Sequence, residues 1–409
     1  MAVSVLSVCF LTQAFPDFQG AYRGIFVENL ARCLVSQGYQ IVVVTPRIYK
    51  VSEKYEERGK LHVYRFFFPS GERPLITYVR IPVFRMIIYM VSCFLRTLNV
   101  IKRYHCRLLH IHWIHPNGIV GVVAKAILRI PFVVHVRGND LNIFALKNHF
   151  FKYLTRMVLR HSDMIICTSK ATKVKMTEAF PEILKHKKAI VVYNEIDAAT
   201  FHPMPEQEAR EKLGIQADGL HFLFIGNLVI EKGVLELVNL MMTLSGAQKG
   251  SNVFLHIVGA GPLEQLLRKK VDENGQNSKI FIHGPVDPRQ IPFWLNASNV
   301  LILPSEREGM PNVILEAVHC GIPVLATDVG DVGRFITENV NGFIMGVGDK
   351  RDELRQHLLR FMANHDELIS MKKRLQNEVN SRGVNEGGCK GVAEIYDALM
   401  SVEEGVSHA

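Results

Sequence analysis

Two glutamates set eight positions apart, Glu308 and Glu316, are residues whose type and spacing suggest chemistry. They lie in EREGMPNVILEA, residues 306–317, between the apolar runs NVLILPS and GIPVLAT. Pro311 suits the first position of a helix, where its missing N–H is not needed, and Met310 would then be a poor N-cap. A helix start without a side-chain cap leaves amides that can bind phosphate.

The predicted helix also separates the two acids. Glu308 precedes it, and Glu316 lies five residues past Pro311, about 7.5 Å along the helix axis. One acid can therefore face a group in front of the helix, while the other faces a group beside its second turn. A sugar joined through a diphosphate to a nucleoside has this extent. The plain alternative is a helix start that water caps.

Other residues suggest chemistry of different kinds. His110, His112 and His115 could bind a metal, since the first two share one face of a strand, but no companion cluster with helical spacing follows. The segment GAGPLE, residues 259–264, resembles a dinucleotide-binding turn, but Glu264 stands in place of the third glycine. We therefore expect no metal and no cofactor.

Strand-like runs rich in valine, isoleucine and leucine alternate with helical patterns and must position these residues. Beyond a first strand at residues 3–11, the runs are YQIVVVTP, RLLHIHW, PFVVHVRG, DMIICTS and AIVVYNE, then HFLFIGN, VFLHIVGAG, KIFIHGP, NVLILPS and PVLATDVG. Such runs are typical of parallel strands buried on both faces. Each half of the chain is thus predicted to be a doubly wound α/β domain.

The charge of the chain is divided unevenly. Residues 1–193 hold 28 lysines and arginines against 10 acids, and residues 194–409 hold 20 against 29, which together give the net charge of +9. We predict an N-terminal domain at 1–193, a linker at 194–218, a second domain at 219–385, and a helix and tail at 386–409 that can pack back on the first domain.

The basic half of the chain should favour an anionic partner. Basic residues recur with helical spacing in two predicted helices, 84–104 and 145–160, which either face solvent or dock on an anionic membrane. The apolar run at 86–95 is too short to span a bilayer. Seven cysteines occur singly and predict reduced, mostly buried thiols in a cytosolic protein.

Seven segments in chain order make the sequence similar to the family 4 glycosyltransferases, which are retaining enzymes of the GT-B fold. These segments are FPDFQGAYRGIFVENLARCLVSQGYQIVVVTP, HIHWIHPNG, PFVVHVRGNDL, NEIDAATFHP, FIGNLVIEKGV, IVGAGPLEQLL and EREGMPNVILEAVHCGIPVLATDVG. They cover nearly the whole chain. The resemblance implies an α/β fold with two Rossmann-like, doubly wound parallel-sheet domains that face each other across a cleft.

The resemblance implies a role for each matching residue. Glu308 would contact the transferred sugar, and Glu316 would bind the ribose hydroxyls. Lys232 would neutralise the leaving diphosphate, as a preorganised cation should. Gly24 and Gly309 would let the backbone approach the phosphates and the sugar. The other implied residues are Asn227, Met310 and Asn312 on the donor side, Arg137 and His135 in catalysis, and His112, Trp113 and Asp140 on the acceptor side.

The sequence departs from the family pattern at three positions. Asn227 stands where many members have arginine, and Glu195 replaces the usual glycine after Asn194. Arg137 stands where many members have histidine, although His135 lies on the same strand face and could take part of that role. The Asp-x-Asp motif with which GT-A transferases hold a metal does not occur in the chain.

The predicted function is transfer of a hexose-type sugar, with retention, from a nucleoside-diphosphate sugar to a hydroxyl of a lipid-linked glycan in polysaccharide biosynthesis. The expected partners are that donor, the glycan or lipid-linked acceptor and an anionic membrane surface at the inner face of the cell membrane, with no nucleic acid. The alternatives are a non-catalytic sugar-nucleotide-binding protein, an NAD-dependent oxidoreductase and a retaining glycoside hydrolase, which also uses two carboxylates.

Overall fold

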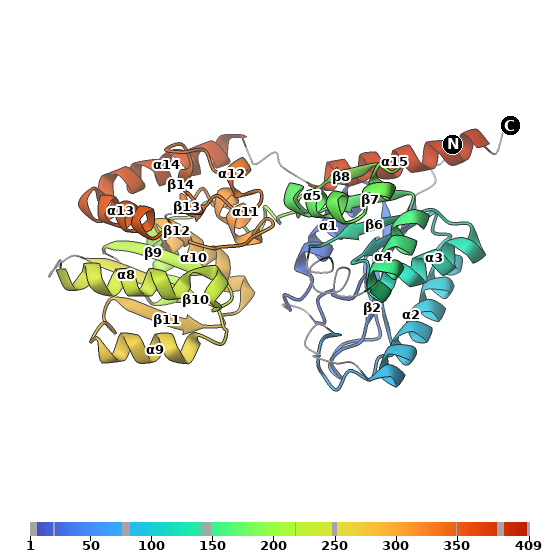
Figure 1. Ribbon diagram of the computed structural model, residues 1–409, viewed down its shortest axis with the longest axis horizontal. Coiled ribbons are helices and arrows are strands. Elements are labelled where there is room, and N and C mark those ends of the chain that lie inside the picture. The colour runs from blue at the N-terminus through green and yellow to red at the C-terminus, as the bar shows by residue number, and fades with distance from the viewer. Residues whose placement is uncertain are drawn as a thin grey trace. The chain divides into compact units, whose positions relative to one another are not determined.

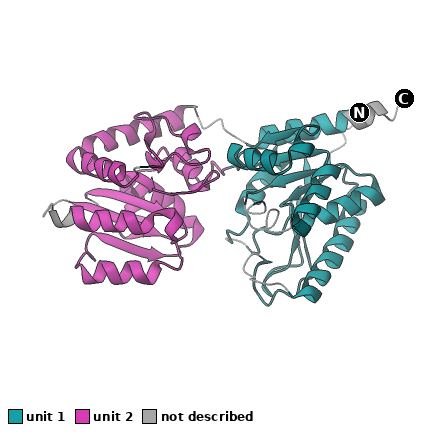
Figure 2. Ribbon diagram, viewed as in Figure 1, with its two compact units in different colours: residues 1–195, 386–409 teal, residues 196–385 magenta. Residues whose placement is uncertain are grey.

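The chain folds into two compact units, each built on a largely parallel sheet (Figures 1 and 2). The computed structural model describes residues 6–18, 21–75, 82–138, 141, 149–216, 218–247, 252–348, 350–382 and 388–406. Unit 1 comprises residues 1–195 and 386–409, and unit 2 comprises residues 196–385. The predicted α/β class with two Rossmann-like domains is confirmed.

The sheet of unit 1 has the strand order β3-β4-β2-β1-β5-β6-β7-β8. Its strands pair in parallel except for β3 with β4 at one edge. The strands are β1 (Ser7–Leu11), β2 (Gln40–Pro46), β3 (Tyr55–Arg58), β4 (Leu61–Phe66), β5 (Leu108–His112), β6 (Phe132–Val136), β7 (Met164–Cys167) and β8 (Ala189–Val191).

Helices cover both faces of this sheet because successive strand residues point to opposite sides. In β1, Val8 and Phe10 join a core with the helices α1 and α15, whereas Cys9 and Leu11 join a second core with α2, α3 and α4. The helices of unit 1 are α1 (Ile25–Ser36), α2 (Val83–Tyr104), α3 (Asn117–Leu128), α4 (His149–His161), α5 (Lys170–Ala179), α6 (Pro181–Leu184) and α15 (Gly388–Val406).

The sheet of unit 2 is parallel, with the order β11-β10-β9-β12-β13-β14. Its strands are β9 (Leu220–Ile225), β10 (Val253–Val258), β11 (Ile280–Gly284), β12 (Val300–Leu303), β13 (Val324–Thr327) and β14 (Gly342–Met345). Its helices are α7 (Glu206–Leu213), α8 (Val234–Ala247), α9 (Glu264–Glu273), α10 (Ile291–Ala297), α11 (Asn312–His319), α12 (Val332–Phe335), α13 (Lys350–Ala363) and α14 (His365–Arg382), with the 3₁₀ turns η3 (Ile230–Lys232) and η4 (Pro288–Gln290).

Three features of the fold differ from the sequence prediction. The strands β3, β4 and β14 were not expected, and β3 is an edge strand with three consecutive charged residues after Tyr55. The stretch predicted as a linker, 194–218, belongs to unit 2 from Ile196 onward, and its helix α7 packs against α10. The first strand begins at Ser7, and residues 3–5 of its predicted range lie outside the described residues.

The prediction of seven reduced cysteines is wrong for one pair. Cys33 in α1 and Cys389 in α15 form a disulfide, although 356 residues separate them in the sequence. The other five cysteines are buried and form no disulfide. No local motif marks such a pair, because the two thiols meet only when α15 packs on α1.

The structure gives a reason for one departure from the family pattern, the glutamate at position 195 in place of the usual glycine. Its carboxylate accepts a hydrogen bond of 2.9 Å from the amide of Cys389, in the first turn of α15. Burial raises the pKa of Glu195, and the amides at this helix start oppose that shift. A glycine at position 195 would leave the start of α15 without this carboxylate.

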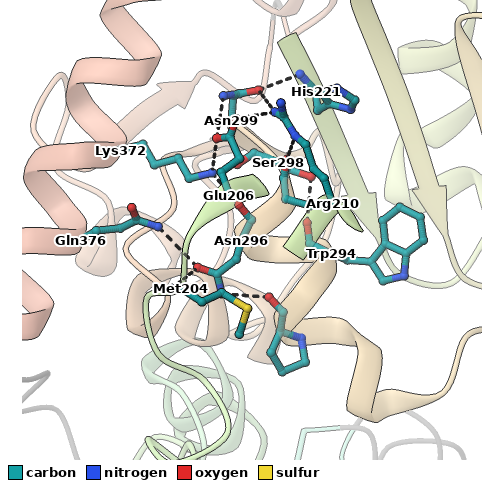
Figure 3. Close-up of polar contacts among 12 residues, drawn as sticks. Met204, Glu206, Arg210, His221, Trp294, Asn296, Ser298, Asn299, Lys372 and Gln376 are labelled. Carbon is teal, nitrogen blue, oxygen red and sulfur yellow. Dashed lines mark hydrogen bonds and ion pairs between the residues drawn. The ribbon is translucent and has the colours of Figure 1, made fainter. Parts of the chain in front are cut away.

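A buried polar network ties the last helix of unit 2 to its body (Figure 3). Lys372 in α14 donates to the Glu206 carboxylate at 2.6 Å and to the carbonyls of Asn296 and Ser298 at 2.6 and 2.7 Å. Arg210 in α7 forms an ion pair with Glu206 and donates to the carbonyl of Ala297. Burial lowers the pKa of Lys372 to about 8. The network therefore clamps α7, α10 and α14 together.

Candidate functional site

The candidate donor site of unit 2 lies where the strand order changes direction. The strands β10 and β12 flank β9 on opposite sides, so the connections that follow β9 and β12 leave in opposite directions. Ligands of doubly wound sheets bind at the carboxyl ends of strands at such a point. Lys232 and Glu308 lie on these two connections, 76 residues apart, and their side chains form an ion pair.

The backbone holds the two connections together. The amide of Glu306 donates to the carbonyl of Glu231 at 2.8 Å and so joins them directly. The amide of Asp331, which follows β13, donates to the carbonyl of Gly309 at 2.9 Å and fixes the second connection to its neighbour. Lys350 binds the carboxylate of Glu306 at 2.9 Å. Because Glu306 has its own cation, Glu308 is the carboxylate of this segment that pairs with Lys232.

The helix α11 begins one residue later than predicted. Its N-cap is Pro311 and its first residue is Asn312, so Met310 precedes the cap; no side chain caps the helix. The shift follows from the extended ψ angle of 125° at Pro311, which lies outside the helical range. Glu316 is 4% exposed in the second turn, and Met310 and Gly309 are partly buried.

The remaining donor-side residue, Asn227, lies with an exposed side chain in the connection after β9. The next residue, Leu228, is buried, and its amide donates to the carbonyl of Ala260 at 2.9 Å. A Cβ atom on Gly259 would lie 1.9 Å from the carbonyl oxygen of Gly226. The glycines of GAGPLE are thus explained by packing against the donor loop, which removes the support for a dinucleotide-binding turn.

In unit 1 the strand order changes direction at β1, between β2 and β5. Gly24 follows β1 and is the N-cap of α1, with a φ angle of +76°. A Cβ atom at this position would lie 2.3 Å from the carbonyl oxygen of Ala14. Glycine is therefore required here by the turn itself, whatever the turn binds.

Arg137 follows β6 and contacts residues at or after the carboxyl ends of β5 and β8. Its guanidinium donates to His112 Nδ1 at 2.7 Å and to the Asn194 side chain at 2.5 Å, and lies 4.8 Å from the centre of the Phe26 ring. Trp113 contacts the same phenyl ring and is 9% exposed. Arg137 is only partly buried, so this cluster presents a cation at the carboxyl ends of β5 and β6.

His135 lies in a stacked group with His110 and His112. His110 Nε2 and His135 Nδ1 are 3.2 Å apart, and His110 Nδ1 is hydrogen-bonded to the Tyr396 hydroxyl of α15. All three rings are buried. Burial lowers the pKa of each of them well below its usual value, and Arg137 lowers it further. The rings are therefore neutral at physiological pH.

The trio of His110, His112 and His115, weighed above as possible metal ligands, is not the one that the fold assembles. His115 is hydrogen-bonded to Thr155 at 2.7 Å, whereas His135 replaces it beside the other two. The ring nitrogens of the assembled trio lie within 4.8 Å of one another. Both nitrogens of His110 already have partners and the guanidinium of Arg137 contacts His112, so the group is poorly suited to a cation.

The sequence prediction missed Phe26, Asn194 and Tyr396. Asn194 carries a signal, since it opens the segment NEIDAATFHP, but its contact with Arg137 depends on the order of the strands. Tyr396 carries none, because it reaches His110 only through the return of α15. The predicted acceptor-side residue Asp140 lies outside the described residues.

Two family models match the chain, one in each unit. The model "Glycosyltransferase Family 4" matches residues 24–200, and the model "Glycosyl transferases group 1" matches residues 205–379. The two matches are adjacent and together span most of the chain. Gly24, His112 and Arg137 fall within the first match, and Lys232, Glu308 and Glu316 fall within the second.

A curated relative and two solved structures are similar over most of the chain. The putative teichuronic acid biosynthesis glycosyltransferase TuaC of Bacillus subtilis is 27% identical, covering 80% of this chain and 82% of its own. A sucrose-phosphate synthase of Thermosynechococcus elongatus has a TM-score of 0.76 at 18% identity, with 97% and 100% coverage. HepE of Anabaena, solved with UDP-glucose, has a TM-score of 0.67 at 16% identity, with 97% and 100% coverage.

Proposed function

Because the chain belongs to the family 4 glycosyltransferases of the GT-B fold, we propose that it transfers a hexose-type sugar from a nucleoside-diphosphate sugar to a hydroxyl of a lipid-linked glycan. Transfer proceeds with retention of anomeric configuration and without a metal. The observation that carries this proposal is the Lys232–Glu308 ion pair at the switch point of unit 2. TuaC, a putative teichuronic acid biosynthesis enzyme, supports a role in polysaccharide biosynthesis by analogy.

Different residues of unit 2 bind different parts of the donor. Lys232 can exchange its contact with Glu308 for the diphosphate, where its charge stabilises the leaving group as the glycosidic bond breaks. The exchange leaves the Glu308 carboxylate available to the sugar. The start of α11 has no side-chain cap, so its positive end suits the phosphates, and the buried Glu316 in the second turn accepts from the ribose hydroxyls.

The residues of unit 1 form the acceptor side. Arg137 presents a cation beside His112 and Trp113 at the carboxyl ends of β5 and β6. A cation at this position suits an acceptor with anionic groups, as a lipid-linked pyrophosphate glycan has. The excess of lysine and arginine in residues 1–193 also favours an anionic acceptor. The protein would then work at the surface of a membrane.

A donor panel and one substitution test the proposal. UDP-, GDP- and ADP-sugars are compared by thermal shift, because a ligand that binds the folded protein raises its apparent stability. With the donor that binds, release of nucleoside diphosphate is followed. Glu308→Gln should lower the turnover by about 100-fold or more while the donor still raises the melting temperature.

The matched control is Glu306→Gln, two residues away, exposed and paired with Lys350. It should keep the turnover within about twofold of the wild type. Normal turnover by Glu308→Gln would remove Glu308 from the mechanism. A donor that binds the wild-type protein and is never consumed, with any lipid-linked acceptor, would instead favour a sugar-nucleotide-binding protein.

A further inference from the structure

One face of unit 1 exposes large apolar side chains on three helices. The helix α3 packs against α2 on one side and α4 on the other (Figure 1). The exposed apolar residues of this α2–α3–α4 face are Phe84, Ile87, Val91 and Leu95 on α2, Val123 and Ile127 on α3, and Phe150 and Tyr153 on α4. Clustered apolar side chains on a surface mark a site of interaction.

The helix α2 is apolar on both sides. Its inner side buries Tyr89, Cys93, Thr97 and Val100 in the core beneath the sheet. Its outer side carries an apolar stripe, the residues 84, 87, 91 and 95, which are spaced by three or four positions and are each more than half exposed. An outer stripe of this kind extends about 16 Å along the helix axis.

By length and composition α2 could cross a membrane, and among the described helices it alone passes that test. However, its inner side packs against β1, β2 and β4. A helix that supplies core residues to a sheet cannot leave it for the bilayer interior without exposing that core. The geometry therefore favours a helix that lies in the plane of an interface over one that spans it.

The charge of the same helices indicates the kind of surface that covers them. α2 carries four lysines and arginines, α3 carries one and α4 carries three, and none of the three helices contains an aspartate or a glutamate. Pairing this face with the same face of a second copy would place cations against cations. An anionic lipid surface satisfies both the apolar stripe and the positive charge.

We propose that the α2–α3–α4 face docks on an anionic lipid bilayer, with the outer stripe of α2 parallel to the membrane plane and inserted at the headgroup boundary. Lys102 and Arg103 on α2 and Arg160 on α4, all exposed, contact the anionic headgroups. The proposal rests on the proposed function for its lipid-linked acceptor, and it assigns the membrane contact to one face of unit 1.

Flotation of the full-length protein with vesicles tests the proposal. Vesicles of phosphatidylcholine alone are compared with vesicles of equal amounts of phosphatidylcholine and phosphatidylglycerol. The triple variant Ile87→Ser, Val91→Ser, Leu95→Ser should bind the anionic vesicles at least about tenfold more weakly than the wild type. The triple variant Lys102→Gln, Arg103→Gln, Arg160→Gln should lose most of the preference for anionic over neutral vesicles.

The matched control replaces exposed apolar residues on other helices, Val174→Ser on α5, Leu266→Ser on α9 and Ile369→Ser on α14. It should bind vesicles as the wild type does. Thermal shift by the donor, measured without lipid, verifies that each variant is folded and tests the proposed function separately. A protein that binds its donor but ignores anionic vesicles overturns the docking proposal alone.

Two further outcomes would also overturn the docking proposal. The first is wild-type vesicle binding by the apolar triple variant, since the stripe would then contribute nothing. The second is a change from dimer to monomer in that variant with vesicle binding unchanged, which would assign the face to a second copy of the chain. Light scattering of each variant in solution distinguishes the two.

Discussion

Both units hold a row of stacked histidines on neighbouring strands, and the two rows have different neighbours. The row of unit 1 lies near the carboxyl ends of β5 and β6, beside Arg137. The row of unit 2 begins near the amino end of β9 and runs to the edge strand β11. The rows are His110, His112 and His135 in unit 1, and His221, His256 and His283 in unit 2.

The surroundings of the two rows differ accordingly. The backbone amide of His221 donates to Asn299, which also contacts Arg210 in the clamp around Lys372. The donor loop with Lys232 follows the opposite, carboxyl end of β9. Stacked imidazoles on neighbouring strands therefore do not by themselves mark a binding site. The two rows differ in their neighbours: His112 contacts Arg137, which follows the carboxyl end of β6, whereas His221 contacts the clamp near the amino end of β9.

The largest expected effect is a loss of stability in unit 2 without a loss of turnover. Lys372→Met removes the donor of three hydrogen bonds, two of them buried, and leaves the carbonyls of Asn296 and Ser298 unpaired. It should lower the free energy of unfolding of unit 2 by about 3 kcal/mol. The chain has two tryptophans, Trp113 in unit 1 and Trp294 in unit 2, so urea unfolding followed by Trp294 fluorescence in a Trp113→Phe background reports on unit 2.

The control for this variant is Lys373→Met, whose side chain is exposed and should change the free energy of unfolding by less than about 0.5 kcal/mol. Under conditions where unit 2 stays folded, Lys372→Met should keep its turnover. A large loss of turnover there would break the comparison, because the clamp would then belong to the catalytic apparatus.

The next effect concerns unit 1, where a substitution should lower the activity and leave the stability nearly unchanged. Arg137→Met removes the cation that contacts His112 and Asn194 and should lower kcat/KM by about tenfold, or about 1.4 kcal/mol. The melting temperature should change little because Arg137 is only partly buried. Arg137→Lys should restore part of the activity, which a purely structural role would not predict.

The exposed residue Arg129 offers the matched control, since it lies just after α3 and away from the cluster around Arg137. Arg129→Met should leave kcat/KM unchanged. If Arg137→Met unfolded unit 1 at a much lower temperature without changing the turnover of the folded protein, the histidine row of unit 1 would be as structural as that of unit 2.

The third effect is a loss of stability in mild acid. Burial lowers the pKa of His221 to about 4 and that of His256 to about 2. These folded values lie below the unfolded value of about 6.5, so the unfolded chain binds more protons as the pH falls. The stabilisation is therefore complete above pH 6.5 and is lost toward pH 4, by about 1 kcal/mol per histidine between pH 7 and 5.5.

Urea unfolding of unit 2 at several pH values measures this effect. Lys372→Met provides the control, because it destabilises unit 2 but keeps both imidazoles, and its loss of stability between pH 7 and 5.5 should equal that of the wild type. A free energy of unfolding that stays constant over this range would show that the row of unit 2 is open to water.

The sequence predicts the two sheets well and their edges poorly. Runs such as YQIVVVTP have a continuous apolar centre because both faces of a central strand are covered. The edge strand Tyr55–Arg58 is mostly charged, and Gly342–Met345 has only four residues, so neither has this signature. The uncapped start of α11 was predictable because proline and methionine cannot cap with a side chain, although its first residue was placed one position early.

Contacts between distant segments lie beyond a reading of the sequence alone. Lys232 and Glu308 were both expected near the donor, but their ion pair depends on β9 and β12 being neighbours. His135 joins His110 and His112 because it lies opposite His112 in the register of β5 and β6. Three histidines at the ends of two adjacent strands would have revealed this group if the strand order had been known.

The helix α15 has a consequence for synthesis of the protein. Unit 1 contains the first 195 residues and the last two dozen, whereas unit 2 is continuous in the chain. Chains emerge from the ribosome amino end first, and domains fold as units. Unit 2 can thus complete its fold while unit 1 still lacks α15, whose Cys389 and Tyr396 pack against residues made hundreds of codons earlier. The first unit to be translated is the last to be finished.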